Sequence, residues 1–192
     1  MTRTVLMVPG FTGSGPGHWQ SHWQRERAEY RRAEQRDWDH PEPGEWLRAL
    51  DEAIAAPRGE VVLVGHSLGC TLIAAWAAAR GPGSVVTALL VAPSDVEAPT
   101  APEEVRGFAP VPLLGLPFRT VVVASTNDPL VTLERARWFA QRWGGQLISI
   151  GPAGHIHTVA GYGPWPEGHA ILRRLLEDVP LRARSASAGD EP

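Results

Sequence analysis

Short apolar runs alternate with longer helical stretches along most of the chain. The runs that predict buried strands, rich in β-branched residues, are residues 4–8, 60–64, 85–92, 120–125 and 146–150. A charged stretch at residues 31–36 predicts a short edge strand. The stretches that predict helices are residues 18–30, 43–56, 67–80, 133–143 and 167–178. This alternation predicts an α/β fold, with a mostly parallel sheet covered by helices on both faces.

The domain organisation follows from length and from two segments that lack the strand and helix patterns. A chain of 192 residues suits a single domain, which we place at residues 1–180. Residues 93–118 contain six prolines and no clear periodicity. We therefore expect a long loop over the end of the sheet and no large lid. Residues 181–192 are poor in apolar side chains, and we expect a disordered tail there.

The composition argues against some classes of binding partner and indicates a cellular compartment. The formal net charge is −3 and no basic block is present, which argues against a nucleic-acid partner. No apolar stretch reaches the length of a membrane span, and the first residues do not resemble a signal peptide. We therefore expect a cytoplasmic protein without membrane contact. Cys70 is the only cysteine, so no disulfide can form within the chain. The oligomeric state stays open.

The candidate chemistry lies where the predicted strands end, because parallel sheets bind ligands beyond the carboxyl ends of their strands. Residues 65–69 read GHSLG and fit the pattern G-x-S-x-G, with a predicted strand before and a helix after. This context is typical of a nucleophile elbow, a strained turn that presents a serine and needs small flanking residues. Ser67 is therefore the candidate nucleophile. The alternative is a plain turn in which the serine only caps the helix.

A nucleophilic serine needs a base, and the base needs an acid that orients it. In this fold their order along the chain is serine, acid, histidine. His155 lies in a glycine-containing loop directly after the predicted strand 146–150, which favours it as the base. His157, two residues further on, is the main rival, and His169 lies inside the last predicted helix.

Two aspartates follow predicted strands between the serine and the histidine. Asp128 follows strand 120–125, the strand immediately before the one that leads to His155. Asp95 follows strand 85–92 and opens the proline-rich segment. The acid usually follows the strand before that of the histidine, so we favour Asp128.

The remaining parts of the site are backbone groups. An oxyanion needs two preorganised N–H donors, and we expect them from Leu68, which follows the nucleophile, and from Phe11 in the loop after the first strand. The sequence contains no metal-ligand spacing, phosphate loop or dinucleotide fingerprint, so we expect neither a metal nor a cofactor.

A series of motifs extends over nearly the whole chain, up to about Val179. They are VPGF at 8–11, HWQSHW at 18–23, DWDHP at 37–41, VLVGHSLGC at 62–70, VAPSD at 91–95, ASTNDPLV at 124–131 and GPAGHIH through GPWPEG at 151–168. In their order they resemble the small serine hydrolases of the retinoblastoma-binding protein 9 type. The resemblance implies a compact α/β-hydrolase fold without a large lid, and Ser67, Asp128 and His155 as the catalytic triad. The signature L-x-C-x-E that binds retinoblastoma proteins is not met, because Leu72 stands in its last position.

The function expected from these features is hydrolysis of a small ester, or of an amide or thioester, through an acyl-enzyme. Two alternatives stay open. One is acyl transfer to an acceptor other than water on the same triad. The other is a non-catalytic binding protein that retains the fold. The small-molecule substrate itself is not identified by the sequence.

Overall fold

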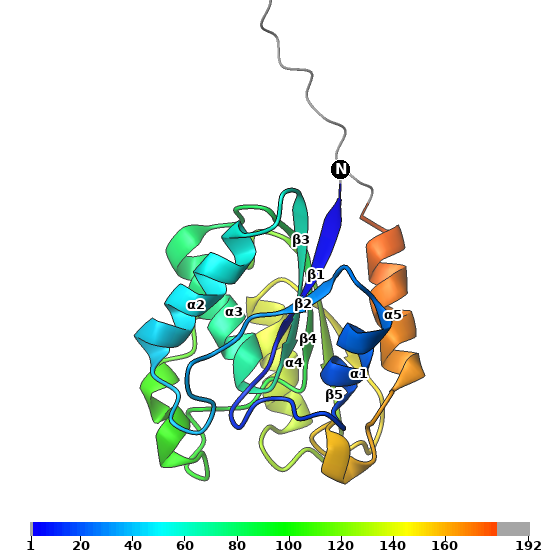
Figure 1. Ribbon diagram of the computed structural model, residues 1–192. Helices are drawn as coiled ribbons and strands as arrows, with labels where there is room; N and C mark the ends of the chain where they lie inside the picture. The colour runs from blue at the N-terminus through cyan, green and yellow to red at the C-terminus, as the bar shows by residue number, and fades with distance from the viewer. Residues whose placement is uncertain (1, 180–192) are drawn as a thin grey trace, which may run out of the picture.

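Figure 1 shows the computed structural model, which describes residues 2–179. The strands are β1 (Arg3–Val8), β2 (Tyr30–Arg32), β3 (Glu60–His66), β4 (Val85–Val91), β5 (Arg119–Ala124) and β6 (Gln146–Ser149). The helices are α1 (Trp19–Glu26), α2 (Pro43–Ala55), α3 (Leu68–Arg80), α4 (Leu133–Arg142) and α5 (Pro166–Glu177), with 3₁₀ turns η1 (Glu103–Phe108) and η2 (Thr158–Ala160). The expected tail at 181–192 lies outside the described residues.

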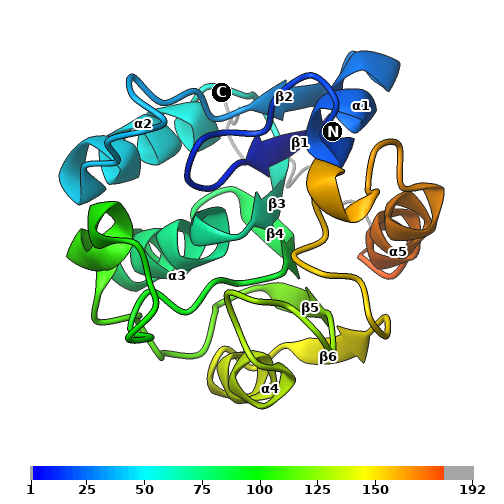
Figure 2. The same cartoon turned by 90° about the horizontal axis from the view of Figure 1, so that it is seen from below.

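All six described strands form one parallel sheet in the order β2-β1-β3-β4-β5-β6. Helices α2, α3 and α4 cover one face of the sheet, and α1 and α5 cover the other. Figure 2, which looks along the strands, shows these two layers on either side of the sheet. The order reverses direction at β1, where the chain leaves for β2 and returns to β3. The predicted α/β class, with a parallel sheet and helices on both faces, is confirmed.

Large aromatic side chains fill both layers between sheet and helices. Trp46 and Trp76 are buried on the face of α2 and α3, and Trp19 and Trp23 are buried on the face of α1 and α5. The buried indoles donate hydrogen bonds from their N–H groups, for example Trp19 Nε1 to the Ile156 carbonyl at 2.9 Å. Each therefore buries a large apolar area without an unpaired donor, which fixes the helices on the sheet.

The edge strand differs from the prediction for residues 31–36. Strand β2 begins at Tyr30 and pairs with β1 at only three positions. The Ala33 amide still donates to the Met7 carbonyl at 2.9 Å, but the chain then turns inward. The Gln35 side chain is buried and donates to the Trp46 carbonyl at 3.4 Å. Strand β2 is therefore shorter than charge patterning predicted, and a buried polar side chain with a partner in α2 stands where the edge strand was expected to continue.

The proline-rich segment 93–118 is compact. Its only helical turn is η1, whose Val105 and Phe108 pack on the core beside α2 and α3. The segment therefore lies at the carboxyl end of the sheet without forming a separate lid domain. The loops that follow β1, β3, β4, β5 and β6 all open at this same end, because the strands are parallel.

Candidate active site

Ser67 lies between β3 and α3 in a backbone conformation that most residues avoid. Its φ and ψ are 54° and −124°, so it needs support from the surrounding packing. A Cβ on Gly69 would overlap the carbonyl group of Val8 at the end of β1. The glycine thus lets the first turn of α3 press against β1, and this contact holds the turn that presents the serine hydroxyl.

A chain of hydrogen bonds joins three of the candidate residues. The Ser67 hydroxyl lies 2.8 Å from Nε2 of His155. Nδ1 of His155 lies 2.9 Å and 3.0 Å from the two carboxylate oxygens of Asp128. Because a carboxylate only accepts, Nδ1 carries the proton and Nε2 accepts from the serine. The side chains of His155 and Asp128 are 6% and 0% exposed, so little water screens the pair.

Hydrogen bonds between the loop after β5 and the loop after β6 hold His155 against Asp128. The Ser125 hydroxyl accepts from the Ala153 backbone amide at 2.9 Å, and the side-chain Oδ1 of Asn127 accepts from the Gly154 backbone amide at 2.8 Å. Ser125 also donates to Asn127 at 2.8 Å. The loop after β5 therefore holds the loop after β6 through side chains. Sequence reasoning missed Ser125 and Asn127, although the run of polar residues between Ala124 and Asp128 could have identified them as candidates.

The rival candidates have other partners. Asp95 forms an ion pair with Arg135 at 3.0 Å, and Arg135 also binds Glu97. His169 lies 3.0 Å from the Tyr30 hydroxyl, between α5 and β2. His157 contacts His155 edge-on, with ring centroids 5.6 Å apart. None of these rivals hydrogen-bonds the serine in the described part of the chain.

The loop after β1 lies directly against the start of α3. A Cβ on Gly10 would come within 2.9 Å of the Leu68 amide nitrogen, so only glycine allows this close approach. Phe11 follows Gly10, and Thr12 next to it donates its amide to the Trp38 carbonyl at 2.9 Å. The amide of Leu68 opens α3 and has no acceptor within the helix. The two backbone segments expected to supply oxyanion donors are thus adjacent to Ser67.

A family model described as serine hydrolase matches residues 5–174. The chain belongs to the serine hydrolase family. It is an α/β-hydrolase of the serine type, as the fold also indicates. The comparison with curated proteins found no match.

Solved structures resemble this serine hydrolase over most of its length. A YdeN-like hydrolase from Pectobacterium atrosepticum is 32% identical, with a TM-score of 0.83 and 93% of each chain covered. The ydeN gene product of Bacillus subtilis is 19% identical, with a TM-score of 0.75, over 92% of this chain and all of that one. The esterase RhEst1 from Rhodococcus is 14% identical, with a TM-score of 0.66, over 93% and 91%. The last two likenesses concern the fold alone.

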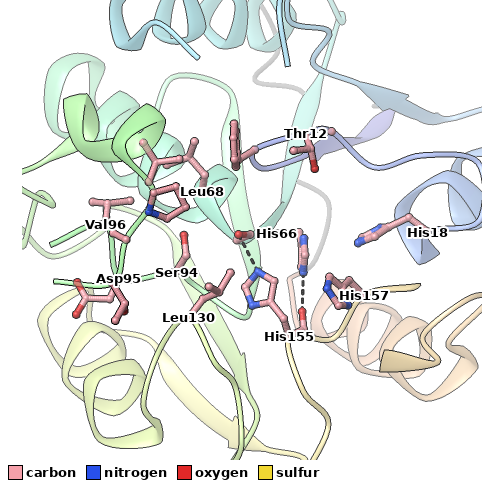
Figure 3. A pocket seen from close by; sticks show the side chains of 17 residues that line it. Thr12, His18, His66, Leu68, Ser94, Asp95, Val96, Leu130, His155 and His157 are labelled. Carbon is pink, nitrogen blue, oxygen red and sulfur yellow. Dashed lines mark hydrogen bonds between the residues drawn. The ribbon is translucent and has the colours of Figure 1, made fainter. Parts of the chain in front are cut away.

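The serine hydrolase has a cavity of about 190 Å³ beside Ser67. One end is lined by apolar side chains, among them Val96 and Leu130. The other end is lined by His18 and His157, and Figure 3 shows these two groups on opposite sides of His155. The cavity is smaller than the 300–1,000 Å³ or so of pockets for drug-sized ligands, which indicates a small substrate.

His66, the residue before the nucleophile, binds the loop of the histidine. Its Nε2 lies 3.0 Å from the backbone carbonyl of His155, to which it donates. Burial lowers the pKa of His66 well below 6.5, and the neighbouring His155 and His18 lower it further. The ring therefore stays neutral and keeps its proton on the nitrogen that holds the loop. Sequence reasoning missed this contact, because it depends on how β3 and the loop after β6 meet in space.

Within residues 2–179, no helix combines the length and the apolar character needed to cross a membrane. The same residues contain no group of three His, Cys, Asp or Glu side chains arranged as metal ligands. The expected cytoplasmic location stays a prediction.

Proposed function

We propose that this serine hydrolase cleaves a small ester through an acyl-enzyme, with Ser67 as nucleophile, His155 as base and Asp128 as acid. One observation carries the proposal: the unbroken hydrogen-bond chain from the Ser67 hydroxyl to the Asp128 carboxylate, which starts at the strained turn before α3. The domain responsible is residues 1–180. The motif resemblance to hydrolases of the retinoblastoma-binding protein 9 type supports the same three residues.

In the first half of the reaction, Ser67 Oγ attacks the ester carbonyl while its proton passes to His155 Nε2. The resulting imidazolium keeps its Nδ1–H on Asp128 at 2.9 Å and 3.0 Å, so the buried carboxylate stabilises the positive charge. The carbonyl oxygen becomes an oxyanion and accepts hydrogen bonds from the amides of Phe11 and Leu68. His155 then protonates the leaving alcohol, and the acyl group stays on Ser67.

In the second half, His155 takes a proton from water, and the hydroxide formed attacks the acyl carbonyl. The same oxyanion contacts stabilise the second intermediate. Its collapse returns the proton to Ser67 and releases the acid. Acyl transfer would follow the same steps with another acceptor in place of water, and amides or thioesters would differ only in the leaving group.

The nucleophile is tested with a fluorophosphonate probe, which labels activated serines. Replacing Ser67 with alanine should abolish labelling and lower kcat at least about 10³-fold, with an unchanged melting temperature. Ser94 also lines the cavity, so Ser94→Ala is the matched control and should keep the label. Release of free acid rather than a transferred acyl product distinguishes hydrolysis from acyl transfer. Full labelling of the Ser67→Ala variant would place the nucleophile elsewhere.

A further inference from the structure

The polar end of the cavity has no part in the hydrolytic steps described above. It is lined by His18 and His157, next to His66 and His155. Figure 3 shows the His18 ring extending from the start of α1 toward His66 and His157. The rings of His18 and His66 meet edge-on, with centroids 4.7 Å apart. Histidines from three separate parts of the chain therefore converge on one end of the cavity.

The proton of His18 can be placed from its contacts. The backbone N–H of Gln20 donates to Nδ1 of His18 at 3.2 Å, so the His18 side chain caps α1. Since Nδ1 accepts, the neutral ring carries its proton on Nε2. This Nε2 is buried and has no hydrogen-bond partner in the described residues. A buried N–H without an acceptor is destabilising. Because His18 is one of the residues that line the cavity, an acceptor atom on a bound molecule would satisfy this group.

The surroundings limit what that acceptor can be. Burial lowers the pKa of His18 to about 3, and the neighbouring His157, Arg32 and His155 contribute to this shift. The donor is thus uncharged over the working pH range. Nδ1 of His157 is also buried without a partner in the described part of the chain. Among the described residues that line the cavity there is no arginine, and the carboxylate of Asp95 lies beside Val96 at the apolar end, bound to Arg135. The polar end therefore offers a counter-ion neither to an anionic nor to a cationic substrate.

We propose that this end of the cavity is a subsite for a second oxygen atom of the substrate, a carbonyl or ether oxygen that accepts the Nε2–H of His18. The apolar part of the substrate then lies at the other end, against Val96 and Leu130. The inference rests on the proposed function, because the scissile carbonyl must lie at Ser67. The substrate class becomes small esters that carry a further uncharged oxygen acceptor.

The probes are esters with a keto group at successive carbons of the acyl chain, each paired with the ester that has a methylene at that carbon. A second series carries the keto group in the alcohol part. The rate of acid release gives kcat/KM for each ester, and each pair gives a ratio. Because the ratio is taken within one protein sample, losses in folding or in the reactivity of Ser67 cancel.

In the wild-type protein we expect one pair to show roughly a tenfold preference for the keto ester, as for one buried hydrogen bond. His18→Asn should reduce this ratio to near one, because its side-chain oxygen still caps α1 but no donor reaches the position of Nε2. His18→Phe, which keeps a ring without a donor, should do the same. His22, one turn along α1 and outside the cavity lining, supplies the control His22→Asn, which should keep the preference.

Two results would overturn the subsite. One is a ratio near one for every pair in the wild-type protein. The other is a keto preference that survives in both His18 variants. Failure of the proposed function looks different, because cleavage of all the esters would then be independent of Ser67, and the subsite would fall with it.

Discussion

Lowering the pH from 7 to 5 should reduce the free energy of unfolding through His18 by about 2 kcal/mol. In the folded chain, burial holds the pKa of His18 at about 3, whereas the exposed side chain has a value of 6.5. Between these two values the unfolded chain binds the proton and the folded chain does not. Acid therefore favours the unfolded state, and the stabilisation, complete above the unfolded pKa, is lost as the pH falls toward the folded one.

The magnitude follows from the two pKa values. At pH 5 an unfolded histidine is almost fully protonated, and proton binding favours the unfolded state by about 2 kcal/mol, against about 0.2 kcal/mol at pH 7. The figure at pH 5 changes little as long as the folded pKa stays below about 4, because the folded ring is then still neutral. The buried His66 has a pKa shifted in the same direction, so the whole protein loses more than the His18 share.

The assay compares urea unfolding of the wild-type protein and His18→Asn at both pH values, followed by tryptophan fluorescence. Asparagine keeps the cap of α1 but has no titrating ring, so its loss between pH 7 and pH 5 should be smaller by about 2 kcal/mol. Each protein is compared with itself, which removes the effect of lost packing. His40→Asn, at a position with 82% side-chain exposure, controls for the loss of any histidine. Equal pH dependence in wild type and His18→Asn would refute a buried, neutral His18.

Two further predictions concern the geometry around the base. Asp128→Asn should lower kcat roughly 10²- to 10⁴-fold with little change in KM, whereas Asp95→Asn should lower kcat at most about tenfold. If Asp95→Asn lowers kcat more than Asp128→Asn does, while both variants melt near the wild-type temperature, Asp95 is the acid. His66→Leu removes the donor to the His155 carbonyl and should lower kcat roughly tenfold at similar KM, and His66→Gln, which keeps an N–H near the same place, should recover most of it. Equal losses in the two His66 variants would show a packing role only.

The fold could be predicted from local patterns because the four central strands, β1, β3, β4 and β5, are buried on both faces and are therefore apolar nearly throughout. Strand β3, with every residue buried, is the clearest case. The prediction failed at β2, which ends at Arg32, whereas Gln35 three residues further on is buried and donates to the Trp46 carbonyl of α2. That contact joins residues of different elements, and neither periodicity nor charge patterning records it.

The candidate site, like the fold, has parts that local sequence patterns predict and parts that they do not. Ser67 is marked by its own neighbours, because a strained turn needs small residues at fixed spacing. The contacts of His66, Ser125 and Asn127 join loops that are 27 or more positions apart. Their polar side chains resemble ordinary turn residues until the loops are placed beside each other. The structure brings Ser67, His155 and Asp128 together, and their catalytic roles stay predictions.

The choice between the two aspartates shows what the structure adds. By sequence, Asp128 is favoured over Asp95 only by the order of the strands. The structure adds a reason based on charge. The Asp95 carboxylate forms an ion pair with Arg135 at 3.0 Å. The side chain of Asp128 is fully shielded from solvent, and both of its carboxylate oxygens face Nδ1 of His155. A carboxylate that is already paired with an arginine stabilises a neighbouring imidazolium only weakly. A carboxylate shielded from water stabilises it more strongly, because little solvent screens the two charges. Within residues 2–179 no arginine is paired with Asp128, so Asp128 is the better candidate for the acid that would stabilise a charged His155.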